Sequence, residues 1–126
     1  SAIEKAQSSI RVQADSFTSV DIAHALVNAF KRRLDVQSLM DKSQLKEKHS
    51  QLSFLAQSGI PVFIDSPSGL AHNKVMIIDQ VSVLTGSFNF TKAAEFRNAE
   101  NLLLIEDPEL AHLYKENWTK RAEKKS

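Results

Sequence analysis

His72-Asn73-Lys74-Val75-Met76-Ile77-Ile78-Asp79, followed after six residues by Gly86-Ser87-Phe88-Asn89, is the most informative segment of this 126-residue chain. The apolar runs within it predict two strands, over residues 72–79 and 82–87. Side chains alternate between the two faces of a strand, so His72 and Lys74 share one face. Asp79 has the opposite parity, which predicts a supporting position at the end of the hairpin.

A hairpin of these two strands would gather polar groups on one face. If Gln80-Val81 is the connecting loop, His72 lies opposite Asn89 and Lys74 lies opposite Ser87. Directly opposed residues on neighbouring strands lie about 5 Å apart. The pattern therefore predicts that an imidazole, an ammonium, a hydroxyl and a carboxamide converge.

These four groups suit a phosphodiester substrate. Lys74, Ser87 and Asn89 can donate hydrogen bonds to the non-bridging oxygens, whose charge is redistributed in the transition state. His72, with an unperturbed pKa of about 6.5, is largely neutral at pH 7 and can act as a nucleophile. Gly86 removes a side chain beside them and allows a substrate to approach the backbone.

Strand and helix periods alternate through the rest of the chain. Ile10, Val12 and Ala14 alternate with Arg11 and Gln13, as in a strand. Apolar runs predict strands over residues 9–15, 36–40, 62–64 and 102–105, the last buried on both faces. Helical spacing predicts helices over residues 20–34, 45–56 and 91–97 and from Pro108 onward, the last with Leu110, Leu113, Tyr114, Asn117 and Trp118 on one side. The expected fold is a single α/β domain over residues 1–126, with a mixed sheet flanked by helices on both faces.

Composition narrows the function classes. Cys is 0, which excludes a thiolate nucleophile, a disulfide framework and a Cys-ligated metal. Lys plus Arg is 16 against 15 Asp plus Glu, so the net charge of +1 provides no general attraction to nucleic acid. No apolar run approaches the length of about 18 residues that a membrane span needs. Any phosphate must therefore be held by locally placed cations.

The pattern His-x-Lys-x4-Asp-x6-Gly-Ser-x-Asn resembles the signature of the phospholipase D superfamily, with every fixed position present. The flanks, including residues 85–95 and Asn98, Glu100 and Asn101, resemble the small bacterial Nuc-type endonucleases of that superfamily. So does the Ser16-Phe17-Thr18 turn. The resemblance covers nearly the whole chain. It also implies a preceding strand and loop outside this sequence, together with any export signal.

The resemblance implies a role for each matching position. His72 would be the nucleophile that forms a phosphohistidine, and Lys74 and Asn89 would hold phosphate oxygens with support from Ser87. Glu100 would orient the histidine, and Asp79 would complete the motif. No metal or other cofactor is expected. The implied location is the periplasm or the medium of a bacterium.

One motif is insufficient for the reaction. Cleavage needs a nucleophile and also an acid for the leaving oxygen. The superfamily uses two motif copies, whereas this chain has one, and His24, His49 and His112 lack the x-Lys context. The expectation is a homodimer with one composite site on its twofold axis, acting on DNA or RNA without sequence preference.

Three alternatives remain open at this point. A phospholipase D acting on phosphatidyl headgroups would use the same motif. A metal nuclease would use Asp65, Asp79 and Glu100. A binding module would carry a dead site.

Overall fold

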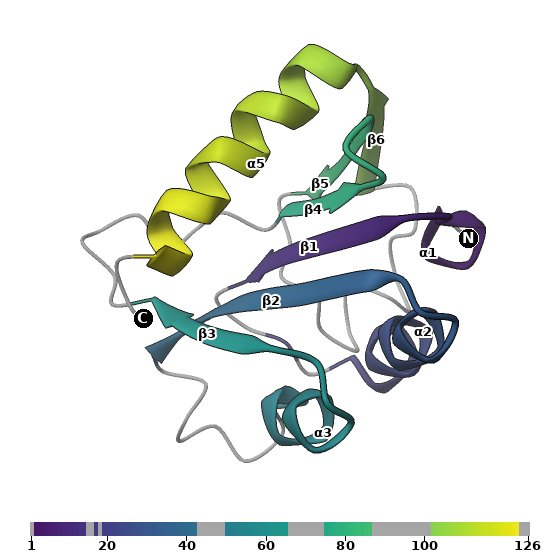
Figure 1. Cartoon of the computed structure of the whole chain (residues 1–126), viewed down its shortest axis with the longest axis vertical. Coiled ribbons are helices and arrows are strands. Elements are labelled where there is room, and N and C mark those ends of the chain that lie inside the picture. Colours follow the sequence, from purple (N-terminus) through teal and green to yellow (C-terminus); the bar gives the residue numbers. More distant parts are fainter. Residues whose placement is uncertain are drawn as a thin grey trace.

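A six-stranded sheet forms the centre of the computed structural model, in the order β3-β2-β1-β4-β5-β6 (Figure 1). The structure describes residues 2–14, 17, 19–42, 50–65, 75–86 and 102–123. The strands are β1 (Ser9–Ala14), β2 (Asp35–Asp41), β3 (Val62–Asp65), β4 (Val75–Ile78), β5 (Ser82–Gly86) and β6 (Leu102–Glu106). The helices are α1 (Ala2–Lys5), α2 (Val20–Lys31), α3 (Leu52–Gln57) and α5 (Pro108–Glu123). The expected mixed α/β sheet with helices on both faces is confirmed.

The sheet combines parallel and antiparallel strands. β1 pairs with β2, and β2 with β3, in parallel, while β4, β5 and β6 continue the sheet in antiparallel order. Parallel neighbours need a crossover connection, and α2 and α3 supply the two crossovers. Ser19 caps the start of α2 by accepting a hydrogen bond of 3.1 Å from the backbone N–H of Ile22, and the helix begins at residue 20, as expected. Gly59 follows α3 with a φ of 98°, a left-handed conformation that favours glycine.

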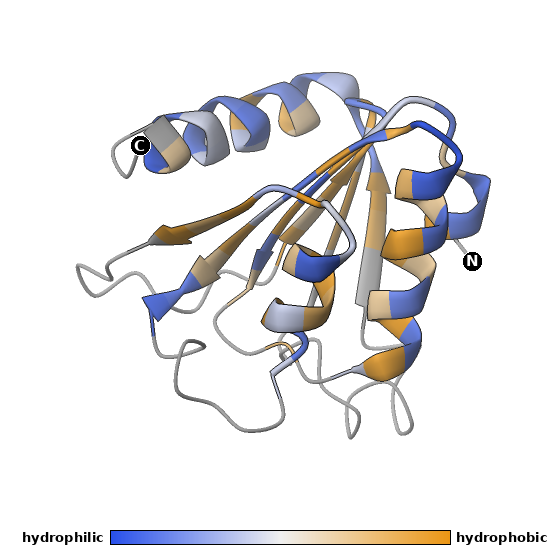
Figure 2. Cartoon of the chain, turned by 60° about the horizontal axis from the view of Figure 1, so that its bottom comes forward, coloured by the Kyte–Doolittle hydropathy of each residue, from blue (hydrophilic) through white to orange (hydrophobic). Residues whose placement is uncertain are grey.

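Helices cover the two faces of the sheet separately (Figure 2). Ile10, Val12 and Met76 face the side on which α2 and α3 pack. The opposite face packs against α5 through the buried residues Leu39, Val75, Ile77, Val83, Ala111, Trp118 and Ala122. Alternate side chains along the strands therefore pack into two cores, one on each face of the sheet, rather than into one core and solvent.

Two features of the C-terminal region differ from the expected pattern. β6 is an edge strand, and Leu104 is 45% exposed, so the prediction that residues 102–105 are buried on both faces is wrong. A continuous apolar run cannot distinguish a central strand from an edge strand. On α5, Leu113 is 63% exposed, because the helix contacts the sheet through Ala111, Trp118 and Ala122 instead.

The connection between β4 and β5 is one residue longer than expected. Val75 lies opposite Thr85 and Ile78 opposite Ser82, so the loop comprises residues 79–81. Asp79 and Gln80 both have positive φ, 56° and 60°, which takes Asp79 out of the strand. The predicted register is therefore wrong by one residue within the described hairpin. The predicted opposed pairs themselves, His72 with Asn89 and Lys74 with Ser87, lie outside the described residues.

Candidate active site

All six strands of the sheet begin or end at one and the same edge, here called the strand-end edge. β1, β2 and β3 are parallel and end there, at Ala14, Asp41 and Asp65. β4 begins there, because Val75 lies opposite Gln13 near the end of β1. Ligands of open α/β sheets commonly bind at the carboxyl ends of the parallel strands.

The two halves of the motif adjoin this edge. Lys74 directly precedes β4 in the chain, and Ser87 directly follows β5, while the pair Val75 and Thr85 joins the two strands beside them. β6 begins at Leu102, opposite Gly86. The chain therefore passes through both motif halves as it enters β4 and leaves β5.

Most of the predicted site residues are not themselves described. His72, Lys74, Ser87, Asn89 and Glu100 lie outside the described residues. Each is within three residues of a strand terminus at the strand-end edge. The described strand ends that are next to them in the chain thus lie on one side of the sheet.

Asp79 lies at the opposite edge from these segments, at the turn between β4 and β5. Its carboxylate accepts hydrogen bonds from the backbone N–H groups of Gln7, Ser8 and Ser9, at distances from 2.7 to 3.1 Å. The hydroxyl of Ser8 also donates to Oδ1 at 3.0 Å, and the N–H of Asp79 donates to the carbonyl of Ser9 at 2.7 Å. Asp79 therefore fixes the hairpin to the start of β1.

These contacts also determine the charge state of Asp79. Burial alone would raise the pKa of this carboxyl, but the N–H groups of Ser8, Gln7 and Ser9 outweigh that effect and hold the pKa below its usual value. The carboxylate therefore stays ionised through the neutral and mildly acidic range. A group held in this way is suited to support rather than to proton transfer.

Arg11 forms a second charged cluster, on the face of the sheet below α5. Its guanidinium pairs with the carboxylate of Asp35 at 2.7 Å and lies 5.4 Å from the ring centre of Trp118. The hydrogen bond from Arg11 lowers the pKa of Asp35, and this effect exceeds the opposing effect of burial. The indole of Trp118 donates a hydrogen bond of 2.8 Å to the carbonyl of Val12.

Sequence patterning does not reveal this cluster. Arg11 falls on the polar side of an alternating strand, which predicts a solvent-facing side chain, yet it is 8% exposed. The apolar side chain of Trp118 on the final helix predicts that this helix packs against another element, but not which residues it contacts. The missing information is that α5 covers the odd-numbered residues of β1.

The described residues do not favour the alternative of a metal nuclease. Asp65 ends β3 at the strand-end edge, whereas Asp79 lies at the opposite edge, so these two carboxylates cannot share one ion. Glu100 lies outside the described residues. Among the described residues, no group of three or more His, Cys, Asp or Glu side chains could hold a metal.

Two of the remaining histidines have ordinary structural surroundings. His24 of α2 packs its ring against Phe54, with the ring centres 4.9 Å apart. His112 of α5 is exposed and pairs with Glu116 at 2.7 Å. His49 lies outside the described residues.

The structure defines an α/β domain in which a His-x-Lys motif directly precedes β4 in the chain and a Gly-Ser-x-Asn motif begins at the last residue of β5. Residues 1–122 match the family model described as "Cardiolipin synthase, PLD-like domain". The chain therefore belongs to the phospholipase D superfamily of phosphodiesterases.

Two solved structures share the fold over most of their length. Nuc from Salmonella typhimurium, a phospholipase D family member, has a TM-score of 0.86 and 46% identity, covering 95% of this chain and 81% of that one. NucT from Helicobacter pylori has a TM-score of 0.80 and 29% identity, covering 97% of this chain and 83% of that one.

The curated relatives are named differently from Nuc and NucT, and they are longer than this chain. A protein of Rickettsia conorii named "Phospholipase D" is 51% identical over 119 residues, which span 94% of this chain. The match spans only 60% of that relative's own length. The chain thus spans about three-fifths of the length of this curated relative.

No described helix is both long and apolar enough to cross a membrane.

Proposed function

We propose that two copies of this chain form a metal-independent endonuclease that cleaves DNA, or RNA, without sequence preference. The observation that carries the proposal is the shared strand-end edge of β4 and β5. Lys74 adjoins the start of β4, and Ser87 adjoins the end of β5 at the pair of Val75 with Thr85. The likeness to Nuc and NucT supports the same function.

The proposed chemistry has two balanced steps. In the first, a ring nitrogen of neutral His72 attacks phosphorus, the P–N bond forms, and the P–O bond to the leaving group breaks. Protonated His72 of the second copy gives its proton to the leaving oxygen. In the second step water attacks phosphorus, gives a proton to that same histidine of the second copy, and breaks the P–N bond.

The remaining motif residues would stabilise charge in both steps. Lys74 and Asn89 would donate hydrogen bonds to the non-bridging oxygens, with support from Ser87, and Glu100 would orient the imidazole. Loss of one such donor typically reduces the rate by about 10²–10³. Two Lys74 side chains in one site would supply the local positive charge that a net charge of +1 does not provide.

A nuclease assay in excess EDTA tests this proposal directly. Plasmid DNA, single-stranded DNA and RNA should be cleaved at undiminished rates when divalent ions are removed. Loss of all cleavage with EDTA would overturn the metal-independent mechanism. The same sample provides the oligomeric state by light scattering.

A second candidate is hydrolysis of phosphatidyl headgroups, which the name "Phospholipase D" of the Rickettsia relative favours. The motif chemistry is the same, because both substrates are phosphodiesters. Parallel assays with phosphatidylcholine or cardiolipin vesicles and with plasmid DNA separate the two. Hydrolysis of lipid alone would favour this candidate and exclude the endonuclease.

A further inference from the structure

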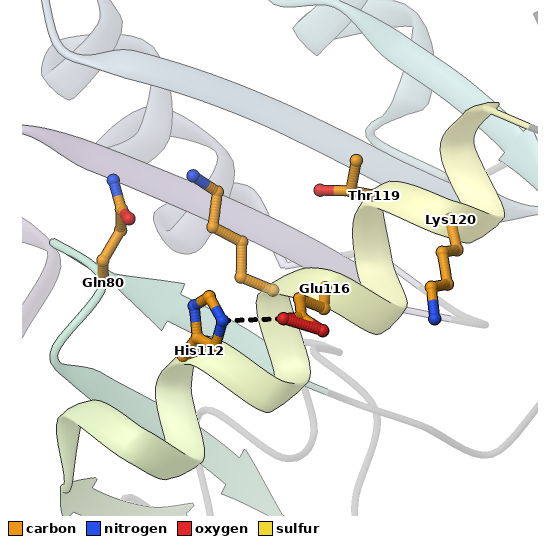
Figure 3. Close-up of a pocket in the computed structure, with 6 residues that line it drawn as sticks. Gln80, His112, Glu116, Thr119 and Lys120 are labelled. Carbon is orange, nitrogen blue, oxygen red and sulfur yellow. Dashed lines mark ion pairs between the residues drawn. The ribbon is translucent and has the colours of Figure 1, made fainter.

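Two hollows flank α5, and they differ in their charge balance. The first has a volume of about 400 Å³ and lies between the outer face of α5 and Gln80 of the β4–β5 turn. Figure 3 shows His112 paired with Glu116 there, with Thr119 and Lys120 on the next turn of the helix. Glu116 offsets part of the positive charge in that hollow.

The second hollow lies between α5 and the strands β1, β2 and β3. It has a volume of about 340 Å³, and its lining includes Arg11, Gln37 and Phe63 from the sheet and Lys115 and Thr119 from α5. Neither of the acidic residues nearby, Asp35 and Glu116, is part of that lining.

The floor of the second hollow contains a buried cation with unused donors. Arg11 is 8% exposed, and a guanidinium carries five N–H donors. Nη1 donates to the carbonyls of Asp35 and Ile10, and Nη2 donates once to the carboxylate of Asp35. Two N–H donors are therefore left without an acceptor in the part of the chain that the structure describes.

The wall of the hollow contains a second cation. Lys115 is half-buried and lines both hollows. Within the described ranges its side chain makes no ion pair or hydrogen bond, although its charge helps to lower the pKa of Asp35. The Thr119 hydroxyl, one helical turn further along, offers a neutral donor on the same wall. A buried guanidinium, an ammonium and a hydroxyl form a donor set suited to a phosphate group.

The register of the sheet relates this hollow to the strand-end edge. Phe63 pairs with Leu39, Leu39 with Gln13, and Gln13 with Val75, which directly follows Lys74. Three strand spacings separate Phe63 from Val75, about 14 Å. Arg11 lies nearer, opposite Ile77 of β4, so the hollow falls within about four nucleotides of the start of β4 along one strand of a duplex.

We infer that the hollow formed by Arg11, Lys115 and Thr119 is an accessory subsite for a backbone phosphate of the nucleic acid, within about four nucleotides of the scissile bond. The inference rests on the proposed function for its substrate. Helix α5 would then help to hold long substrates, which is a role that the motif residues do not have.

The test compares a long substrate with one too short to reach the subsite. Lys115→Ala should raise KM for single-stranded DNA of about 30 nucleotides roughly fivefold to tenfold, with kcat changed less than about twofold. The slope of log affinity against log salt should fall by about one unit. Cleavage of a dinucleotide should change little, because it ends before the subsite.

Lys31→Ala is the matched control. Lys31 is an exposed lysine at the end of α2, on the other face of the sheet, and its removal costs the same charge. An unchanged KM for the long substrate in Lys115→Ala would overturn the subsite. So would an equal effect in Lys31→Ala, which would indicate only the loss of net charge, or an equal effect on the dinucleotide.

The subsite can also be tested separately from the proposed function. If the unmodified protein cleaves no nucleic acid, the endonuclease proposal is overturned. Binding of the same oligonucleotide, followed by fluorescence anisotropy, then decides the subsite. Weaker binding in Lys115→Ala than in Lys31→Ala supports it, and equal binding overturns it.

Discussion

The carboxylate of Asp79 accepts two hydrogen bonds from Ser8, one from its backbone N–H at 2.7 Å and one from its hydroxyl at 3.0 Å. The two residues are 71 positions apart in the chain. Asp79 belongs to the sequence motif of the candidate site but lies at the opposite edge of the sheet from the other motif segments. Its effect on chemistry would therefore be exerted through the position of the β4–β5 hairpin.

Removal of this carboxylate should destabilise the fold. Asp79→Ala leaves the N–H groups of Gln7, Ser8 and Ser9 without their acceptor, which we expect to cost about 1–2 kcal/mol in the free energy of unfolding, measured by urea titration. Asp79→Asn retains one acceptor oxygen and should cost less. An Asp79→Ala variant as stable as the parent would contradict the anchoring role.

Acid should weaken the fold through the same group and through Asp35. Both carboxyls have a folded-state pKa below the usual value of 3.8, so each stabilises the fold at any pH above that value. Their contribution should be lost as pH falls below about 4 toward the folded-state pKa values. Urea midpoints between pH 7 and pH 3 measure the loss. In Asp79→Asn the decline over this range should be shallower, and an identical decline would exclude Asp79 as a contributor.

Replacement of the proposed nucleophile should abolish hydrolysis without unfolding the protein. We expect His72→Asn to reduce kcat by at least about 10³-fold, because no other group in the motif can form the covalent intermediate. His112→Asn is the control, since His112 is exposed on α5 and its ion pair with Glu116 contributes little to stability. If His72→Asn cleaved as fast as the parent, the mechanism would be wrong.

The composite site predicts that activity depends on assembly. Light scattering should give twice the mass of one chain, and the specific activity should fall on dilution below the dimer dissociation constant. Mixed dimers of parent and His72→Asn chains should have little activity, because each site would lack one of its two histidines. A fully active monomer would refute the shared site.

Trp118 should contribute to stability through both its ring and its N–H. Trp118→Phe keeps most of the apolar surface but loses the hydrogen bond to Val12, at an expected cost of about 1–2 kcal/mol measured by thermal unfolding. Leu113→Ala, on an exposed part of the same helix, should change stability by less than about 0.5 kcal/mol. Equal effects of the two substitutions would show that the indole contact is unimportant.

Local patterns in the sequence predict most of the fold. The strand expected at residues 9–15 is confirmed over Ser9–Ala14, and the helix expected from residue 20 begins there, because alternation and helical spacing are short-range signals. The burial of Arg11 and the exposure of Leu104 could not be predicted in this way. Both depend on which element covers which face or edge, and that is settled by contacts between distant segments.

For the candidate site too, local patterns predict one part, and contacts between distant segments determine the rest. Residue spacing predicts a His-x-Lys strand next to a Gly-Ser-x-Asn strand, and the adjacent antiparallel strands β4 and β5 agree with it. The register was wrong by one residue, because the left-handed conformation of Asp79 depends on its contacts with residues 7–9. Turn length in a hairpin is set by such contacts when the turn residues have no strong preference of their own.

The hydrogen bond from Trp118 to Val12 joins positions that are 106 residues apart. The first half of the sheet, from β1 to β3, lies within the first 65 residues, and without the rest of the chain β1 has one side unpaired and one face uncovered. During synthesis that surface stays open until β4 and finally α5 leave the ribosome. Chains interrupted before Trp118 should therefore expose Arg11 and the apolar face around it, and are expected to aggregate or be degraded rather than persist as partly active fragments.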